Sequence, residues 1–242
     1  MEQESPIVLA SILGLVLGLV FGVTAQRTNF CTMGALSDAV FMGDWNRFRS
    51  WMLAIAIAIL GSQALHIGGV LDLRSSIYLT PNLGWAGAIF GGTLFGFGMT
   101  MTGGCGNKTL VRLGAGNLKS LIVVIFIGIF AYMTLRGLTG LARVELEEIL
   151  NIDLQSRGID DQGLPTFLSF LGLSDLPARL ISIGVITLGL FFFVFKSREF
   201  RASRANLAGG VIIGLLIPTA WYVTGVIGFD DFEPTPLASL SF

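Results

Sequence analysis

Residues 92–130 read GTLFGFGMTMTGGCGNKTLVRLGAGNLKSLIVVIFIGIF, two apolar runs separated by a short, glycine-rich and more polar stretch around Cys105. A transmembrane α-helix needs roughly 20 mostly apolar residues, and both runs can be extended to that length. The stretch around Cys105 is too short to cross a bilayer, and its backbone could not face lipid with unpaired polar groups. The segment therefore predicts an all-α integral membrane protein with a short broken or re-entrant helix packed inside it.

The composition of the whole chain indicates the same class. Of the 242 residues, 53% are hydrophobic and 13% are charged, and the mean hydropathy is +0.77. Soluble domains carry about 25% charged residues. A net charge of −1 gives no basic surface for nucleic acid. Two cysteines and one histidine are too few for a disulfide scaffold or a four-ligand structural zinc site, so we expect no metal and no cofactor.

Six apolar runs have about the length of a transmembrane helix. They are Pro6–Ala25, Ser50–Val70, Gly84–Thr102, Leu118–Leu138, Ala178–Lys196 and Leu207–Gly228. We therefore expect residues 1–242 to form a single multi-pass transmembrane domain. A polar segment over residues 139–177 separates the fourth span from the last two spans, which fall within residues 178–228.

The basic residues predict how the chain is oriented. With the N-terminus outside, ten lysines and arginines fall in the inner segments and five in the outer ones. This is the sense of the positive-inside rule, so we expect both termini outside. In the outer polar segment, VELEEILNIDL (residues 144–154) has the apolar spacing of an amphipathic helix lying on the membrane surface. The alternative is a solvated connecting loop.

An internal repeat places the two cysteines at matching points. Residues 18–60 read GLVFGVTAQRTNFCTMGALSDAVFMGDWNRFRSWMLAIAIAIL, in which Cys31 takes the place of Cys105. The residues that recur at equal distances before each cysteine are Gly18, Phe21 and Gly22 in one copy and Gly92, Phe95 and Gly96 in the other. The two units cover about residues 6–70 and 84–138. Each consists of a span, a loop that contains the cysteine, a short helix, a basic turn and a second span. Since each unit holds two spans, both cysteines should lie at the same side of the membrane.

The cysteine loops predict an anion site. We expect short helices over residues 31–42 and 105–113 that begin at the cysteines, and a helix N-terminus attracts anions through its free N–H groups. Two such ends near the midplane resemble the discontinuous-helix sites of transporters. Thiols add soft, weak hydrogen-bond donors, which favour a substrate that contains sulfur or selenium. The candidate substrate-binding residues are Cys105, Cys31, Gly103, Gly104, Gly106, Asn107 and Asn29.

Several other features have structural explanations. Each cysteine by itself could be a small apolar side chain. The glycines of GLVLG (residues 14–18) and GTLFG (residues 92–96) are small-xxx-small patterns that we expect to pack helices. Asp38 could form a buried pair with Arg27, and the tryptophans should lie in the interfacial belts. Lys108 and Arg112 could steer an anion or anchor the inner interface.

Three motifs carry a resemblance to a known family. RTNFCTMGALSDAVFMGDWNRFRSW (residues 27–51), DLRSSIYLTPNLGW (residues 72–85) and GFGMTMTGGCGNKTLVRLGAGNLKSL (residues 96–121) resemble the YeeE/YedE family of bacterial inner-membrane sulfur transporters. The resemblance runs from about the first helix to Trp221. It implies thiosulfate uptake across the inner membrane, with Cys31 and Cys105 contacting the passing ion. It also implies a cytoplasmic sulfur-carrier protein of the TusA-like type as a partner.

The family pattern also implies a longer chain. Its members typically have a second half in inverted topology with a further GGC-type cysteine, where this chain ends in PTPLASLSF. The chain would then be a truncated product, a half that pairs with another copy or a partner, or a short member of the family.

Together these features predict a transporter of thiosulfate or a related sulfur anion, and not an enzyme. The alternative is a membrane thiol redox or sulfur-relay protein acting between Cys31 and Cys105. Membrane disulfide oxidoreductases usually carry a C-x-x-C pair, which this sequence lacks.

Overall fold

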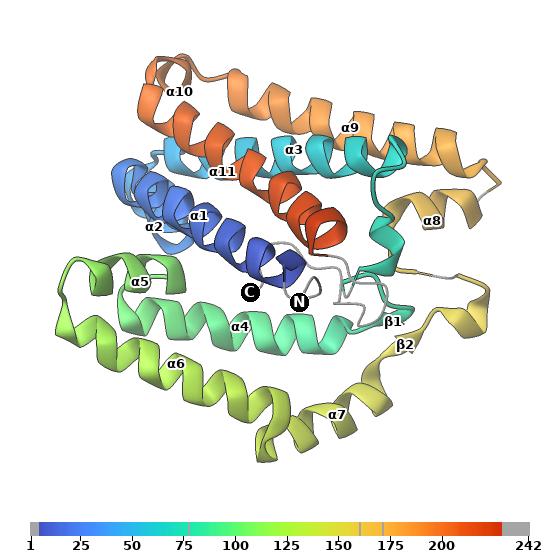
Figure 1. Ribbon diagram of the computed structural model, residues 1–242, viewed down its shortest axis with the longest axis horizontal. Coiled ribbons are helices and arrows are strands. Elements are labelled where there is room, and N and C mark those ends of the chain that lie inside the picture. The colour runs from blue at the N-terminus through green and yellow to red at the C-terminus, as the bar shows by residue number, and fades with distance from the viewer. Residues whose placement is uncertain (1–4, 77, 160, 171, 229–242) are drawn as a thin grey trace.

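The computed structural model describes residues 5–76, 78–159, 161–170 and 172–228, which are almost entirely helical (Figure 1). The prediction of an all-α membrane protein is confirmed. The long helices are α1 (Ser5–Thr28), α3 (Asn46–Ile67), α4 (Trp85–Thr102), α6 (Leu118–Arg136), α9 (Asp175–Phe195) and α11 (Arg204–Tyr222). The two ends of the predicted domain, including the PTPLASLSF tail, lie outside the described residues.

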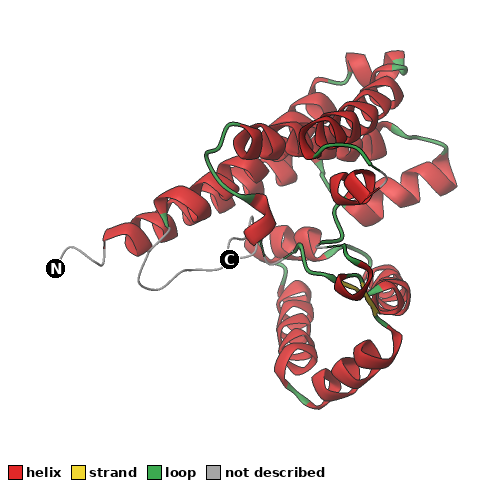
Figure 2. Ribbon diagram, turned by 90° about the vertical axis from the view of Figure 1, so that its right-hand side faces the viewer, coloured by secondary structure: helices red, strands yellow, loops and turns green. Residues whose placement is uncertain are grey.

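Short elements connect these helices. The short α-helices are α2 (Thr32–Ser37), α5 (Gly106–Gly114), α7 (Leu138–Leu150), α8 (Leu164–Phe170) and α10 (Arg198–Ala202). Two π-helical turns, η1 (Asp38–Met42) and η4 (Val223–Ile227), and two 3-10 turns, η2 (Leu73–Ser75) and η3 (Gln155–Arg157), extend or join them. Strands β1 (Asn82–Leu83) and β2 (Ile152–Asp153) pair antiparallel, with Asn82 opposite Asp153 (yellow in Figure 2).

Five segments of the described chain are long and apolar enough to cross a membrane. They are Val8–Met42, Asn46–Ile67, Leu118–Arg136, Asp175–Phe195 and Arg204–Ile227. The remaining predicted span is α4, an 18-residue helix in which five glycines and three threonines dilute the apolar side chains. Figure 1 shows α4 extending from β1 to α5, between the same two ends of the molecule as the other long helices. The count of six spans stays a prediction.

In the bundle of α1, α3, α9 and α11, α9 packs on α3, whereas α11 packs on both α1 and α3. Helix α11 lies close to α3 because glycines at the contact leave room for the facing backbone. A Cβ atom at Gly214 would lie 2.8 Å from the carbonyl oxygen of Ala54, and one at Gly61 would lie 2.6 Å from Pro218 Cγ. Around this contact the core contains the buried residues Leu17, Leu53, Ala54, Val194, Phe200, Ile213, Leu216 and Ala220.

The glycines that we expected to pack helices do not do so within the described chain. A Cβ atom at Gly14, Gly18, Gly92 or Gly96 would meet nothing within 4 Å. Helix α1 packs instead through Leu13, Leu17 and Phe21, whose side chains contact the core clusters. For contacts within the described chain the prediction was wrong, because a small-xxx-small pattern shows only where a close approach is allowed, and larger side chains can supply the actual contact.

Both halves of the predicted repeat have the same order of elements. A long helix, a break at the cysteine, a short helix and a second long helix occur as α1, α2, α3 and as α4, α5, α6. In the first half a π-helical turn at Asp38–Met42 lengthens the short helix, and the second half has no such turn. The repeat as a structural unit stays a prediction, and the shared order of elements supports it.

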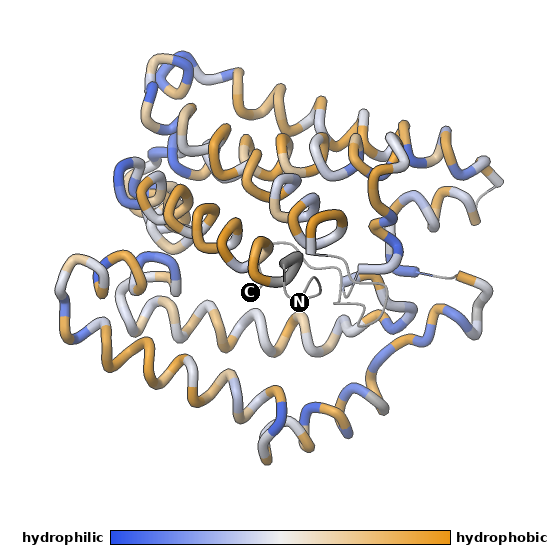
Figure 3. The backbone as a smooth tube through the Cα atoms, viewed as in Figure 1, coloured by the Kyte–Doolittle hydropathy of each residue, from blue (hydrophilic) through white to orange (hydrophobic). Residues whose placement is uncertain are grey.

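Polar residues gather at the two ends of the molecule, and apolar residues dominate between them (Figure 3). One end holds α2, α5 and α10 with the start of α3, where the basic residues predicted to be inside are found. The other end holds β1, β2 and α8 (Figure 1). The structure therefore groups the predicted inner loops together and apart from the predicted outer segment.

The helix predicted over residues 144–154 is present in part. Helix α7 begins earlier, at Leu138, and ends at Leu150, because Ile152 and Asp153 leave the helix to pair with β1. The indole N–H of Trp85 donates to the carbonyl of Leu150 at 2.7 Å, which ties the end of α7 to the start of α4. The predicted location of this helix on the membrane surface stays a prediction.

Candidate functional site

The Cys31 loop reverses the chain between two helices. Helix α1 ends at Thr28, and Asn29 then takes a left-handed backbone conformation with φ of 52°. Such a φ is uncommon outside glycine, although asparagine tolerates it better than most residues. Cys31 is extended and is the N-cap of α2, where its carbonyl accepts from the N–H of Ala35 at 2.9 Å. The predicted start of the short helix at Cys31 agrees with this geometry.

The Cys105 loop uses the same arrangement. Gly103 ends α4 with φ of 67°, two residues before the cysteine, as Asn29 lies two residues before Cys31. Cys105 is extended and is the N-cap of α5. Its carbonyl accepts from the backbone N–H of Thr109 at 3.0 Å and from the Thr109 hydroxyl at 3.1 Å. Because the left-handed residue turns the backbone in both loops, each thiol is presented at the start of a short helix.

These two loops bring the cysteine sulfurs into contact. Cys31 Sγ and Cys105 Sγ lie 3.2 Å apart, and either can be the donor. Both residues are buried, with 3% and 4% of their surfaces exposed, and both are free thiols.

The other predicted site residues lie around this pair. Gly104 is buried directly before Cys105, whereas Gly106 and Asn107 form the half-buried first turn of α5. A Cβ atom at Gly106 would meet nothing within 4 Å, so the backbone there is open to approach. Asn29 is hydrogen-bonded across to the other loop, where its side-chain oxygen accepts from Lys108 Nζ at 2.8 Å.

Arg47 fixes the first loop from the start of α3. Its guanidinium donates to Asp38 Oδ2 at 2.8 Å and to the carbonyl of Asn29 at 2.7 Å. The expected pairing of Asp38 with Arg27 was wrong. Helix α2 and its π-helical extension turn Asp38 back toward the beginning of α3, where Arg47 lies. On the second loop Arg112 has a similar role, since it donates to the carbonyl of Gly103 at 3.2 Å.

Apolar side chains hold Phe30, the residue that precedes Cys31. The ring of Phe30 stacks on Trp51 of α3, with ring centroids 4.6 Å apart, and Phe30 is buried together with Ala25, Ala54 and Ile213. We expected Trp51 in an interfacial belt, so the sequence analysis missed this contact. Trp221, expected in the same belt, is also buried, beside Leu71 and Leu73. The available signal for this buried contact was that Trp51 lies within its helix and not at a free end.

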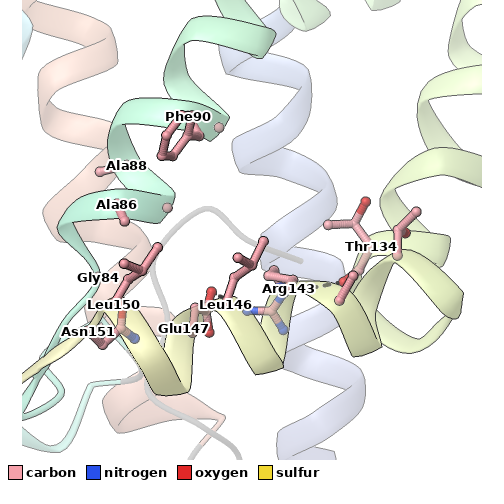
Figure 4. A pocket seen from close by; sticks show the side chains of 14 residues that line it. Gly84, Ala86, Ala88, Phe90, Thr134, Arg143, Leu146, Glu147, Leu150 and Asn151 are labelled. Atoms are coloured by element: carbon pink, nitrogen blue, oxygen red, sulfur yellow. Dashed lines mark hydrogen bonds and ion pairs between the residues drawn. The ribbon is translucent and has the colours of Figure 1, made fainter.

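A separate cavity lies at the other end of α4. It is a partly open pocket of about 740 Å³ between α4 and α7, lined by residues such as Ala86, Phe90 and Leu146 (Figure 4). An ion pair between Arg143 and Glu147, at 2.8 Å, lies along its wall. Its lining comes from residues 84–91 and 134–151 and includes none of the predicted site residues. The thiol site and this cavity are therefore distinct.

Comparison with known proteins shows which sequences this chain is similar to. A family model described as sulphur transport matches residues 27–239, which include both cysteine loops. The thiosulfate transporter TsuA of Spirochaeta thermophila is 27% identical over 207 residues, covering 84% of this chain and 61% of that protein. The thiosulfate transporter TsuA of Escherichia coli is 31% identical over 122 residues, covering 50% of this chain and 32% of that protein. The chain thus spans less than two thirds of the length of these relatives.

Proposed function

Because the chain belongs to the sulphur transport family, in agreement with its resemblance to YeeE/YedE proteins, we propose that it takes up thiosulfate or a related sulfur-containing anion. In this proposal the anion passes between the Cys31 and Cys105 loops, and the protein is a transporter rather than an enzyme. The observation that carries the proposal is the contact of two buried thiols, 3.2 Å apart, each at the start of a short helix. Relatives named as thiosulfate transporters support the choice of substrate.

The physical basis is the concentration of donors at one point. The first turn of α5 has backbone N–H groups without partners inside the helix, and they carry a partial positive charge. Gly106, which follows Cys105, leaves this first turn uncovered, because a Cβ atom there would meet nothing within 4 Å. When an anion enters between the sulfurs, the S–H···S contact of the two cysteines is lost. The anion then accepts hydrogen bonds from both thiols and from several backbone amides. We therefore assign Cys105, Gly103, Gly104, Gly106 and Asn107 to the binding loop.

The two thiols differ in their surroundings. Cys105 lies between glycines, whereas Cys31 lies between Phe30 and Thr32, and Phe30 is stacked on Trp51. We assign Cys105 to the main contact with the anion and Cys31 to a gate that opens less readily. Asn29, which precedes Cys31, contributes to this second loop.

A thiol redox or sulfur-relay protein is the second candidate. The same contact favours it, because a relay also needs two sulfurs within reach of each other. The two functions differ in what they require. Transport proceeds without an electron acceptor, and a relay that oxidises the two thiols must pass their electrons on.

The helices α4 and α6 offer a surface for further protein. Their apolar side chains are widely exposed, among them Phe90, Phe97 and Phe126 at 66%, 66% and 55%. We propose that a second copy of the chain, or a partner protein, packs beside these helices and completes the path, with lipid around the rest. We further propose a single transmembrane domain in the bacterial inner membrane, with both termini outside. A TusA-like sulfur carrier would then meet the end that holds α5.

Uptake by purified protein in liposomes tests the proposal. Vesicles are loaded with buffer alone, and entry of thiosulfate, sulfite, sulfide and sulfate is measured without any electron acceptor. We expect thiosulfate entry that exceeds sulfate entry and is lost in Cys105→Ala. Entry that depends on an added acceptor would favour the relay, and equal entry with and without protein would contradict transport.

A further inference from the structure

A hydrogen bond beside the thiol contact joins the same two loops. Lys108, three residues after Cys105 on the first turn of α5, donates from Nζ to Asn29 Oδ1 at 2.8 Å. Asn29 lies two residues before Cys31. The lysine–asparagine bond and the sulfur contact therefore join the same two loops, the bond among exposed side chains and the sulfurs in the interior.

The two partners of this bond differ in how firmly they are held. The backbone of Asn29 is turned by its left-handed conformation, and its carbonyl accepts from Arg47, which Asp38 holds in turn. Lys108 reaches across on a flexible four-carbon stem, and its ammonium has two further donor hydrogens. When the two loops separate, Lys108 is the partner that can move.

The charge of Lys108 is not neutralised by its partner. Arg47 on the facing loop is paired with the carboxylate of Asp38, whereas Lys108 donates to a neutral amide oxygen. Arg112, one turn further along α5, likewise donates to a neutral carbonyl, that of Gly103. Within the part of the chain that the structure describes, the hydrogen-bond acceptors of both α5 cations are thus uncharged. A cation held only by a neutral acceptor can exchange it for an anion and gain electrostatic energy.

We infer that the Lys108–Asn29 bond is a latch across the path, and that Lys108 leaves Asn29 to hold the oxyanion end of the substrate while the thiols contact its sulfur end. This inference rests on the proposed function and specifies its substrate class, an anion with a soft sulfur at one end and charged oxygens at the other. Thiols suit the first end, and a lysine ammonium suits the second.

The accessibility of the thiols tests the latch without any transport. Purified protein is treated with an anionic and a cationic reagent, sulfonatoethyl and trimethylammonioethyl methanethiosulfonate. In each reaction a cysteine thiolate forms a disulfide with the reagent and methanesulfinate leaves, and intact mass follows the rate. The variants are Asn29→Gly, which keeps the positive φ, Lys108→Gln, and Lys108→Arg. Lys119→Gln, an exposed lysine on α6, is the matched control for net charge.

The two halves of the inference give separate results. Loss of the latch in Asn29→Gly should raise both labelling rates about fivefold, the effect of one net hydrogen bond, with the ratio of the rates unchanged. Lys108→Gln should also raise the rates, but it should lower the anionic-to-cationic ratio about tenfold, because a positive charge near the thiols is lost. Lys108→Arg should restore the ratio, and Lys119→Gln should change neither quantity.

Unchanged rates in Asn29→Gly would overturn the latch, and an unchanged ratio in Lys108→Gln would overturn the placement of the charge. A lysine that merely anchors the interface gives the second of these results. Because the labelling needs no substrate, it remains informative even if the protein transports no sulfur anion. If thiosulfate uptake is present, Lys108→Gln should raise its KM and Asn29→Gly should not.

Discussion

Phe30 lies almost flat against Trp51, with ring centroids 4.6 Å apart and 24° between the ring planes. Since Phe30 directly precedes Cys31, a side chain from the long helix α3 holds the first cysteine loop in place. The position of one thiol relative to the other therefore depends on an aromatic contact outside both short helices.

Trp51→Leu should loosen this loop. The loss of the ring contact should cost about 1 kcal/mol of stability, as expected for an aromatic pair, and should lower uptake more than it lowers the amount of folded protein. Thermal unfolding in detergent and uptake in liposomes measure the two effects. Tyr132→Leu, at an exposed position on α6, is the control. Full uptake by Trp51→Leu would show that the contact does not position Cys31.

Cys105→Ala should abolish thiosulfate uptake while the protein stays folded and inserted, and Cys31→Ala should weaken it. Cys105→Ser separates two causes, because serine keeps a donor of similar size and loses the polarisable sulfur. If sulfur chemistry matters, serine should fail nearly as badly as alanine. Normal uptake by Cys105→Ala at wild-type membrane levels would refute the site assignment.

The two thiols should form a disulfide under a mild oxidant. Diamide, an azo compound, takes up the two electrons and two protons as the sulfurs join, and a sulfur separation of 3.2 Å leaves little movement to make. Intact mass should show the loss of two hydrogens, and uptake should stop until a reducing agent is added. Thiosulfate in the buffer should slow the reaction. A protein that keeps two titratable thiols after such treatment would contradict the contact.

Gly214→Val should destabilise the bundle. A Cβ atom at Gly214 would lie 2.8 Å from the carbonyl oxygen of Ala54, so α11 and α3 must move apart, at a cost of about 1–3 kcal/mol. Gly184→Val on α9 is the matched control, because a Cβ atom there would meet nothing within 4 Å. Thermal unfolding of both variants in the same detergent measures the difference. Equal stability would mean that the α3–α11 contact is not close.

The orientation can be measured with reporter fusions. A reporter that is active only outside the cytoplasm should be active when joined after Ser156 and inactive when joined after Ser203, as the distribution of basic residues predicts. A reporter active only in the cytoplasm should give the reverse pattern and acts as the control. Activity of the first reporter at Ser203 would invert the proposed topology.

The sequence predicted the helices well because a membrane imposes a simple rule on them. Long apolar runs must be helical, so the predicted span Leu118–Leu138 differs by only two residues from α6. The short helices were predictable for a related reason. A chain too short to cross and too polar to face lipid must turn back, and glycine and asparagine two residues before the cysteines allow that turn.

Lateral contacts were harder to predict. Helices and lipid tails are equally apolar, so composition does not show which face meets a neighbour. This is why the glycines at positions 14 and 18 were expected to pack, whereas Gly61 and Gly214 make the close contacts. The pairing of Arg47 with Asp38 depends on a π-helical turn that no spacing rule for an α-helix includes. The 3.2 Å separation of the sulfurs likewise arises from the meeting of two loops 74 residues apart.

Substitutions at four glycines can show whether the protein assembles with another molecule. These glycines are Gly14, Gly18, Gly92 and Gly96, which have unoccupied space around them. Within the described chain a Cβ atom added at any of them would meet nothing within 4 Å. Variants to valine should therefore leave the isolated protein as stable as before. If cells that depend on uptake nevertheless reject such variants, the selection acts on contacts that a second molecule makes at these glycines. The mutational tolerance of four glycines would then map the outline of that molecule before its identity is known.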